Sequence, residues 1–286
     1  MPAWLCSNAI CSVRERSNPR GPRTMAPSIS PAAGTDGVAA RISDVVMEFQ
    51  TTSGPVRGLD DVSLELREGE FLVLVGRSGS GKTTALNVLA GLHTATIGEV
   101  SVLAQPPVAA RPQLGYMFAR DALLPWRTAL KNVEFGLEVR GFAKSERRAL
   151  ARDYLDLVSL KRFADNYPSQ LSQGQRQRVA LARTWAPSPK ILLMDEPFSA
   201  LDAQTRESLH EEFVRMWAAD KKSVVFVTHD LNEAITLADR ILVFKDGKIA
   251  KEFSIPFARP RDLVDITADR TARDIYHEIR QLLYQH

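Results

Sequence analysis

A glycine-rich segment at residues 76–83 has the composition and spacing of a phosphate-binding loop (P-loop). It fits the pattern GxxxxGK[ST] and reads Gly76, Arg77, Ser78, Gly79, Ser80, Gly81, Lys82 and Thr83, followed by Thr84. Glycines let successive backbone N–H groups turn toward phosphate oxygens, and a helix that begins here would add positive potential. Lys82 is expected to reach the β- and γ-phosphates, and the Thr83 hydroxyl to bind Mg²⁺. A glycine-rich turn without a ligand is the competing interpretation.

Two carboxylates follow an apolar run further along the chain. The run is Ile191–Met194, and Asp195 and Glu196 come next. An acidic pair at a strand end is common, so this motif is weak alone, but it gains weight downstream of a P-loop. We expect Asp195 to hold Mg²⁺ through water, and Glu196 to act as the general base that polarises an attacking water.

A second candidate anion site lies between the P-loop and the acidic pair. It is formed by Leu171, Ser172, Gln173, Gly174 and Gln175, which precede an alanine-rich stretch of helical composition. Serine is a good N-cap, and the N–H groups at a helix N-terminus attract anions. A capped surface helix without a ligand would have the same sequence features.

The segments around these motifs predict the elements that must position them. The apolar run Phe71–Val75 predicts a buried parallel strand leading into the P-loop, and apolar residues at helical spacing over 85–92 predict a helix after it. Further strands are predicted at Val62–Arg67, Ile191–Met194, Val224–Val227, Ile241–Phe244 and Ile249–Phe253, the last two flanking a turn. Strands that alternate with helices indicate an α/β fold with a parallel sheet.

The chain divides into regions of different character. Residues 1–40 are rich in Pro, Ser, Ala, Gly and Arg and predict a disordered tail, within which Met25 is an alternative start. The motifs lie within residues 41–262, and the mostly helical stretch at about 111–185 predicts a helical insertion into the sheet domain. Residues 263–286 are expected to form a C-terminal helical extension.

The composition limits the classes of protein to consider. Hydrophobic residues make up 44% and charged residues 25% of the 286, which is ordinary for a globular protein. A net charge of +3 is too small to indicate a nucleic-acid partner. No apolar run approaches the roughly 18–20 residues that cross a bilayer, so a membrane role needs another chain. The two cysteines, Cys6 and Cys11, match no zinc pattern and fit a reducing compartment.

Taken together, the motifs resemble those of the ABC ATPases. LSQGQ at residues 171–175 is similar to the LSGGQ signature, and it lies between the P-loop and the acidic pair in the family's order. Ser199–Asp202 looks like the family's D-loop, and His229 looks like its switch histidine. Phe49 is similar in position to the aromatic residue that stacks on adenine, although a core aromatic is the alternative.

The resemblance implies a RecA-like P-loop NTPase core with an inserted helical subdomain, ATPase activity, and ATP and Mg²⁺ as cofactors. In this family two subunits form a dimer, and each ATP lies between the P-loop of one copy and the signature of the other. The resemblance assigns catalysis to Lys82, Glu196 and His229. It also implies that the ATP site is completed by Ser172, Gly174, Gln175 and Asp202.

Three stretches are similar to the nitrate, sulfonate and taurine importers: Leu123–Trp126, Asp195–Arg206 and Arg259–Asp262. They imply the ATP-hydrolysing subunit of a bacterial importer, peripheral to the cytoplasmic face of the plasma membrane. Its expected partners are two transmembrane permease subunits and a solute-binding protein, with no nucleic acid. A non-transport cytosolic ABC ATPase is the alternative, but such proteins carry tandem cassettes or a long coiled coil. The sequence does not indicate which solute is carried.

Two positions depart from the family pattern. Gln173 replaces the first signature glycine, a mild change because Ser172 and Gly174 are kept. An ungapped alignment through Leu124–Trp126 places Ala119 where the family has the Q-loop glutamine, whose amide normally reaches Mg²⁺ and the attacking water. The change at Ala119 concerns the coupling of hydrolysis to transport, not membership of the family.

Overall fold

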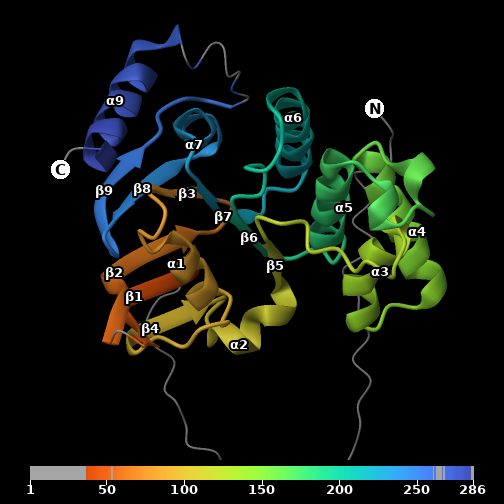
Figure 1. Cartoon of the computed structure of the whole chain (residues 1–286), viewed down its shortest axis with the longest axis horizontal. Coiled ribbons are helices and arrows are strands. Elements are labelled where there is room, and N and C mark those ends of the chain that lie inside the picture. Colours follow the sequence, from red (N-terminus) through yellow and green to blue (C-terminus); the bar gives the residue numbers. More distant parts are fainter. Residues whose placement is uncertain (1–36, 53, 260, 262–265, 267, 285–286) are drawn as a thin grey trace, which may run out of the picture. The chain divides into compact units, whose positions relative to one another are not determined.

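The computed structural model describes residues 37–52, 54–259, 261, 266 and 268–284, which form two β-sheets with associated helices (Figure 1). The strands are β1 (Val38–Thr51), β2 (Gly54–Arg67), β3 (Phe71–Gly76), β4 (Ile97–Val102), β5 (Leu114–Met117), β6 (Ile191–Asp195), β7 (Ser223–Thr228), β8 (Arg240–Lys245) and β9 (Lys248–Ser254). The helices are α1 (Lys82–Leu89), α2 (Pro107–Ala110), α3 (Ala129–Val139), α4 (Lys144–Leu157), α5 (Gln173–Trp185), α6 (Ala203–Ala219), α7 (Leu231–Leu237) and α9 (Arg270–Tyr284). Short 3₁₀ turns lie at Arg111–Gln113, Lys161–Phe163 and Pro168–Gln170.

The larger sheet contains the buried strands expected from the sequence. Its order is β5-β6-β7-β3-β8-β9, with parallel neighbours except for β9, which returns antiparallel along β8. Alternate residues of β3 face two different cores: Val73 and Val75 face one, and Leu72 and Leu74 the other. Both faces of the strand are therefore buried, which explains its continuous apolar sequence. Because parallel strands end at the same edge, the segments after β3, β6 and β7 meet there.

The smaller sheet is antiparallel, with the order β2-β1-β4. Helix α1 lies between the two sheets (Figure 1). Its apolar residues Ala85, Leu86 and Leu89 are buried in one core with Leu72 and Leu74 of β3. The helix that follows the P-loop is thus held on two sides, which fixes the position of its N-terminus.

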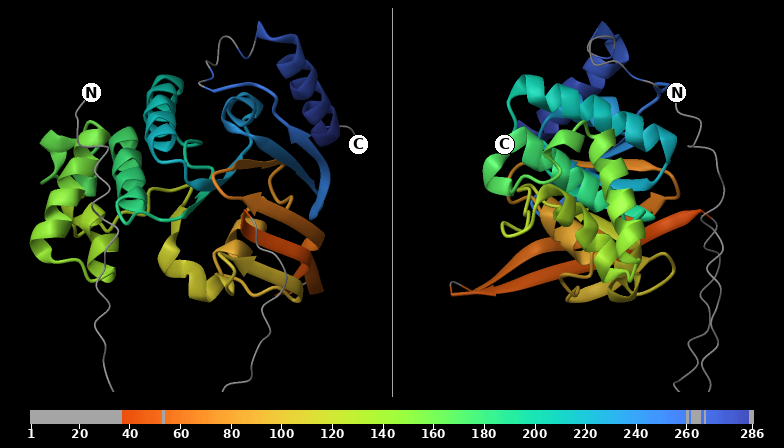
Figure 2. Two further views of the ribbon diagram at one scale, coloured as in Figure 1. Left: turned by 180° about the vertical axis from the view of Figure 1, so that it is seen from behind. Right: turned by 90° about the vertical axis from the view of Figure 1, so that its right-hand side faces the viewer.

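Helices α3, α4 and α5 pack against one another beside β5, while α9 packs against α7 and β8 (Figure 2). Val133, Leu155 and Val179, one from each helix of the first group, are fully buried. The stretch at about 111–185, expected to be mostly helical, also contains a strand that was not predicted, because Leu114–Met117 forms β5 and pairs with β6 in the larger sheet. A strand of four residues is too short to show a clear two-residue alternation.

The ends of the folded region also differ slightly from expectation. Strand β1 begins at Val38, inside the predicted tail, because Ala40 pairs with Leu66 of β2 and Val102 of β4, and Ala39 and Ala40 are buried in the adjoining core. Residues 1–36 of the predicted tail lie outside the described residues. A C-terminal helix was expected, and α9 is a regular helix whose Ala272, Ile279 and Leu283 are buried.

Candidate nucleotide site

The P-loop connects β3 to α1 and carries a buried ammonium group. Lys82 is 5% exposed. Its Nζ donates hydrogen bonds to the carbonyl oxygens of Gly76 at 2.8 Å and Arg77 at 2.9 Å. Burial lowers the pKa of Lys82, while the nearby carboxylates of Glu196 and Asp195 oppose that shift. The cation is therefore held by acceptors from its own loop, close to the two carboxylates.

Two glycines in the loop are required by the backbone. A Cβ at Gly76 would lie 2.5 Å from the carbonyl oxygen of Phe244 and 2.5 Å from Ser80 Oγ. Gly81 has φ +104° and caps α1, and a Cβ there would lie 2.6 Å from the carbonyl oxygen of Gly58. Both positions exclude any side chain, so the pattern in the sequence reflects close packing as well as phosphate binding.

A cavity of about 530 Å³ opens beside the loop. It is lined by Arg77, Ser78, Gly79, Ser80, Phe244, Lys245, Asp246 and Leu283. Leu283 belongs to α9, so the C-terminal helix contributes to the surroundings of the P-loop. No local feature of the sequence marked this residue, because the contact spans the length of the domain.

Thr83 and Asp195 form the candidate metal site. Thr83 Oγ1 donates to Asp195 Oδ1 at 3.0 Å. Burial raises the pKa of Asp195, and the hydrogen bond from Thr83 opposes that rise. Mg²⁺ is usually held by one or two protein oxygens together with substrate phosphates, and this pair fits such a role. Among the described residues, no group of three or more His, Cys, Asp or Glu side chains could hold a metal.

Glu196 and His229 meet at the carboxyl edge of the larger sheet, although 33 residues separate them in the sequence. Glu196 Oε2 lies 3.2 Å from His229 Nδ1. Glu196 has φ +45°, a left-handed conformation that costs a non-glycine residue energy. The conformation is held by the N–H of Glu196, which donates to the Val227 carbonyl at 2.9 Å, and by Ser199, whose hydroxyl donates to the Glu196 carbonyl at 3.0 Å.

Phe49 lies on β1 near the start of α1. Its ring meets His93 edge-on, with the ring centroids 5.4 Å apart. A Cβ at Gly58 would lie 2.6 Å from the Phe49 ring and 3.3 Å from Thr84 Cγ2. Gly58 thus allows the aromatic ring to lie close to Thr84, the residue that follows the P-loop motif. Sequence reasoning missed Gly58, since nothing in its neighbours indicates this contact.

The signature residues form the first turn of α5. Ser172 Oγ accepts from the N–H of Gln175 at 3.3 Å, and Gln175 Oε1 accepts from the N–H of Ser172 at 2.9 Å, so the predicted N-cap is confirmed as a capping box. Asp202 caps α6 in the same way, accepting from the N–H of Thr205 at 3.0 Å. A Cβ at Gly174 would lie 2.4 Å from Thr205 Cγ2. Within one chain, the signature residues at the start of α5 therefore pack against the start of α6, which follows the D-loop.

Ala119 follows β5 at the edge that carries the acidic pair. Met117 pairs with Met194 in the parallel register of β5 and β6. Ala119 is two residues beyond Met117, as Glu196 is two residues beyond Met194. Ala119 thus lies as far beyond β5 as Glu196 lies beyond β6, at the same edge of the sheet.

The segment after Ala119 is attached to the helices of the inserted region. Arg176 of α5 donates from Nε to Asp121 Oδ2 at 2.9 Å. Arg183 of α5 donates to the carbonyl oxygen of Asp121 at 2.7 Å. Asn132 of α3 is fully buried and donates to the carbonyl of Leu124 at 3.1 Å. These contacts join the segment to α3 and α5, and the local sequence gave no sign of them because the residues they connect are distant in the chain.

A phosphate-binding loop, a strand that ends in two carboxylates and a histidine beside the second carboxylate define the class of P-loop ATPases. A family model described as ABC transporter matches residues 59–199. An uncharacterized ABC transporter ATP-binding protein of Methanocaldococcus jannaschii is 44% identical over 80% of this chain and 86% of its own length. The nitrate import ATP-binding protein NrtD of Synechocystis is 43% identical over 75% and 81%, and the bicarbonate transport ATP-binding protein CmpD of Synechocystis is 38% identical over 89% and 90%.

Solved structures agree with this assignment. A dimeric ATP-binding cassette in a post-hydrolysis state with ADP and Pi is 35% identical, with a TM-score of 0.70 over 77% of this chain and all of that one. The chain belongs to the ABC transporter family as an ATP-binding protein, and its fold is the RecA-like P-loop fold with an inserted helical region. It is therefore an ATPase. In the described part of the chain, no helix is both long enough and apolar enough to span a bilayer.

Proposed function

We propose that this protein is the ATP-hydrolysing subunit of an importer for a small solute of the nitrate or bicarbonate kind. The observation that carries the proposal is its similarity, over most of both chains, to relatives named for nitrate import and bicarbonate transport. The three subfamily stretches support it, although Pro260 and Asp262 of the third lie outside the described residues. The separate alternative of a cytosolic ABC ATPase has no comparable support.

The site residues have distinct proposed roles in hydrolysis. P-loop N–H groups and Lys82 hold the phosphate chain, and the Phe49 ring stacks on adenine. Glu196 accepts a proton from the water that attacks the γ-phosphorus, the bond to the bridging oxygen breaks, and ADP and phosphate result. His229 orients the Glu196 carboxylate from 3.2 Å away. Thr83 and Asp195 would hold Mg²⁺, which when bound neutralises charge on the phosphate oxygens.

A homodimer completes the site in this proposal. The signature residues Ser172, Gly174 and Gln175, with Asp202, would face the ATP held by the P-loop of the second subunit. The N-terminus of α5 supplies N–H groups and positive potential for that contact. Hydrolysis then depends on closure of the dimer, because each chain alone presents only half of each site. Closure would be transmitted to the membrane partners through α3, α4 and α5.

The membrane partners would be two permease subunits, supplied with solute by a binding protein, at the cytoplasmic face of the membrane. Trp126 is 71% exposed, which is unusual for such a large side chain. Its segment is nevertheless rigid, because Asn132 donates to the carbonyl of Arg127 at 2.9 Å and of Thr128 at 3.0 Å. An exposed aromatic on a rigid segment is well suited to contact a permease.

Reconstitution with the permease tests this function. The tagged chain would be co-expressed with candidate permease subunits, purified in detergent and incorporated into vesicles with the binding protein. We expect ATP turnover to rise when nitrate or bicarbonate is supplied, and Trp126→Ala to weaken permease binding while basal turnover stays unchanged. A chain that never binds a permease, with turnover that no solute changes, would refute the importer role.

A further inference from the structure

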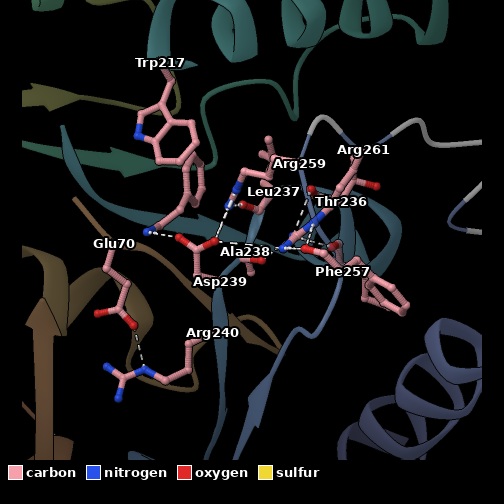
Figure 3. Close-up of polar contacts among 12 residues, drawn as sticks. Glu70, Trp217, Thr236, Leu237, Ala238, Asp239, Arg240, Phe257, Arg259 and Arg261 are labelled. Carbon is pink, nitrogen blue, oxygen red and sulfur yellow. Dashed lines mark hydrogen bonds and ion pairs between the residues drawn. The ribbon is translucent and has the colours of Figure 1, made fainter. Parts of the chain in front are cut away.

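Two arginines from the third subfamily stretch bind around Asp239 and the end of α7 (Figure 3). Asp239 accepts from the first residue of β3, so they lie at the end of this strand opposite the P-loop. We propose that Arg259 and Arg261 are positioning residues for hydrolysis. They hold the far ends of β3, α6 and α7, the three elements whose near ends carry the P-loop, the D-loop and the switch histidine. The inference rests on the proposed role of His229, and the experiment below separates the two.

Arg261 holds the C-terminal end of α7. Its side chain is only 3% exposed. Its guanidinium donates to the carbonyl oxygens of Phe257 at 2.7 Å, Ile235 and Thr236 at 3.3 Å each, and Ala238. The last carbonyls of a helix lack partners within it, and a cation there also interacts well with the helix dipole. Burial and the nearby Arg259 lower the pKa of Arg261 to about 10, so it stays charged at neutral pH.

Arg259 joins the same helix end to β3 and α6. Its Nη2 lies 2.8 Å from Asp239 Oδ1 and also donates to the Leu237 carbonyl. The other oxygen of Asp239 accepts from the N–H of Phe71, the first residue of β3, at 2.9 Å. The guanidinium lies over the ring of Trp217, near the end of α6, at 4.4 Å from the centroid. One side chain thus contacts three elements (Figure 3).

The three elements lead directly to the catalytic loops. β3 runs from Phe71 to Gly76 at the start of the P-loop, and α6 begins after the D-loop residue Asp202. α7 has seven residues and follows His229, with Asp230 as its N-cap. A helix of that length spans about 10 Å, so a tilt at its C-terminal end is carried to the histidine. Misplacement by about 1 Å far from the chemistry can reduce a rate by about 100-fold.

A purely structural role is the competing explanation, because loss of Arg261 would leave buried carbonyls unpaired. A structural defect would lower the folded fraction and would act whether or not His229 is present. A positioning defect would lower kcat of the folded protein, leave ATP affinity almost unchanged, and disappear once the histidine is removed. These two explanations therefore predict different double-mutant cycles.

The experiment measures kcat and ATP affinity of the full chain for Arg261→Met, His229→Ala and the double variant, corrected for folded fraction by circular dichroism. We expect Arg261→Met to lower kcat about tenfold, with the ATP dissociation constant changed about twofold or less. In the His229→Ala background we expect Arg261→Met to have almost no further effect, because residues acting as a unit are non-additive. Leu155→Ala, which creates a cavity in α4 away from these loops, is the stability-matched control and should leave kcat unchanged.

Conservative variants keep the test decisive if Arg261→Met does not fold. Arg261→Lys keeps the charge but loses the planar fork, so it should fold and show a smaller loss of kcat that again vanishes without His229. Arg259→Lys also loosens the contacts to β3 and α6, so its loss of kcat should remain in part when His229 is absent. An unchanged kcat in the folded Arg261 and Arg259 variants would overturn the inference, as would an equal loss of kcat in the Arg261 variants with and without His229. If His229→Ala alone leaves kcat unchanged, the proposed histidine role fails first, and the inference falls with it.

Discussion

Glu233 should make the stability of this protein depend on pH. It lies in the first turn of α7, where one carboxylate oxygen accepts from the Thr228 hydroxyl and the other is buried without a partner. Burial raises its pKa from 4.5 to about 7; Asp230 and Glu196 add to the rise, and Arg206 and the Thr228 hydrogen bond oppose it. Glu233→Gln removes the charge while keeping the shape, so it isolates the cost of ionising this group.

The direction of the pH effect follows from the pH at which the folded and the unfolded state each release the Glu233 proton. The unfolded chain ionises Glu233 near pH 4.5 and the folded protein near pH 7, so the stability from this group is complete below pH 4.5 and is lost as pH rises through 7. At about 1.4 kcal/mol per pH unit, the full loss of unfolding free energy is about 3.5 kcal/mol. Glutamine stays neutral throughout. The free energy of unfolding of Glu233→Gln, relative to that of wild type, should therefore increase by about 2 to 3 kcal/mol between about pH 5 and about pH 8.

Urea denaturation at several pH values measures this difference. His210, whose pKa burial lowers to about 4, destabilises the fold as pH falls below its ordinary 6.5, but it acts equally on both proteins and cancels. Glu207→Gln on α6 is the matched control, since Glu207 is exposed and the chemical change is identical. Parallel pH profiles for wild type and Glu233→Gln would refute the reasoning.

The remaining predictions concern the nucleotide site. Lys82→Ala should abolish turnover, whereas Glu196→Gln should keep ATP binding, lower turnover about 100-fold or more, and accumulate an ATP-bound dimer in size-exclusion chromatography; a monomeric Glu196→Gln with normal turnover would contradict the mechanism. Phe49→Ala should weaken ATP binding about fivefold to 150-fold by calorimetry, since stacking on a base is worth about 1–3 kcal/mol, and Phe49→Trp should bind normally; equal affinities would leave Phe49 as a core residue. Ala119→Gln should raise basal turnover several-fold at unchanged ATP affinity, and a lower rate would count against Ala119 as the Q-loop position.

Local patterns were enough to predict most of the fold. The apolar run Phe71–Val75, the helical spacing after the P-loop and the turn at Asp246 each involve residues close together in sequence, so their signals are read directly. The short strand Leu114–Met117 was missed because its identity depends on pairing with Ile191–Met194, far along the chain. The buried start of β1 was missed for a similar reason.

The candidate site likewise combines features that the local sequence predicts with features that depend on contacts between distant residues. The sequence by itself determined the P-loop, the acidic pair and the capped signature helix, because each is a short segment whose backbone and side chains act locally. Only the tertiary structure decided that Glu196 and His229 lie 3.2 Å apart. It also decided that Gly174 is needed for the close contact between α5 and α6, and that Arg259 and Arg261 bind Asp239 and the end of α7. These contacts join residues distant in sequence, and the packing of two cores around one sheet, not any local pattern, brings them together.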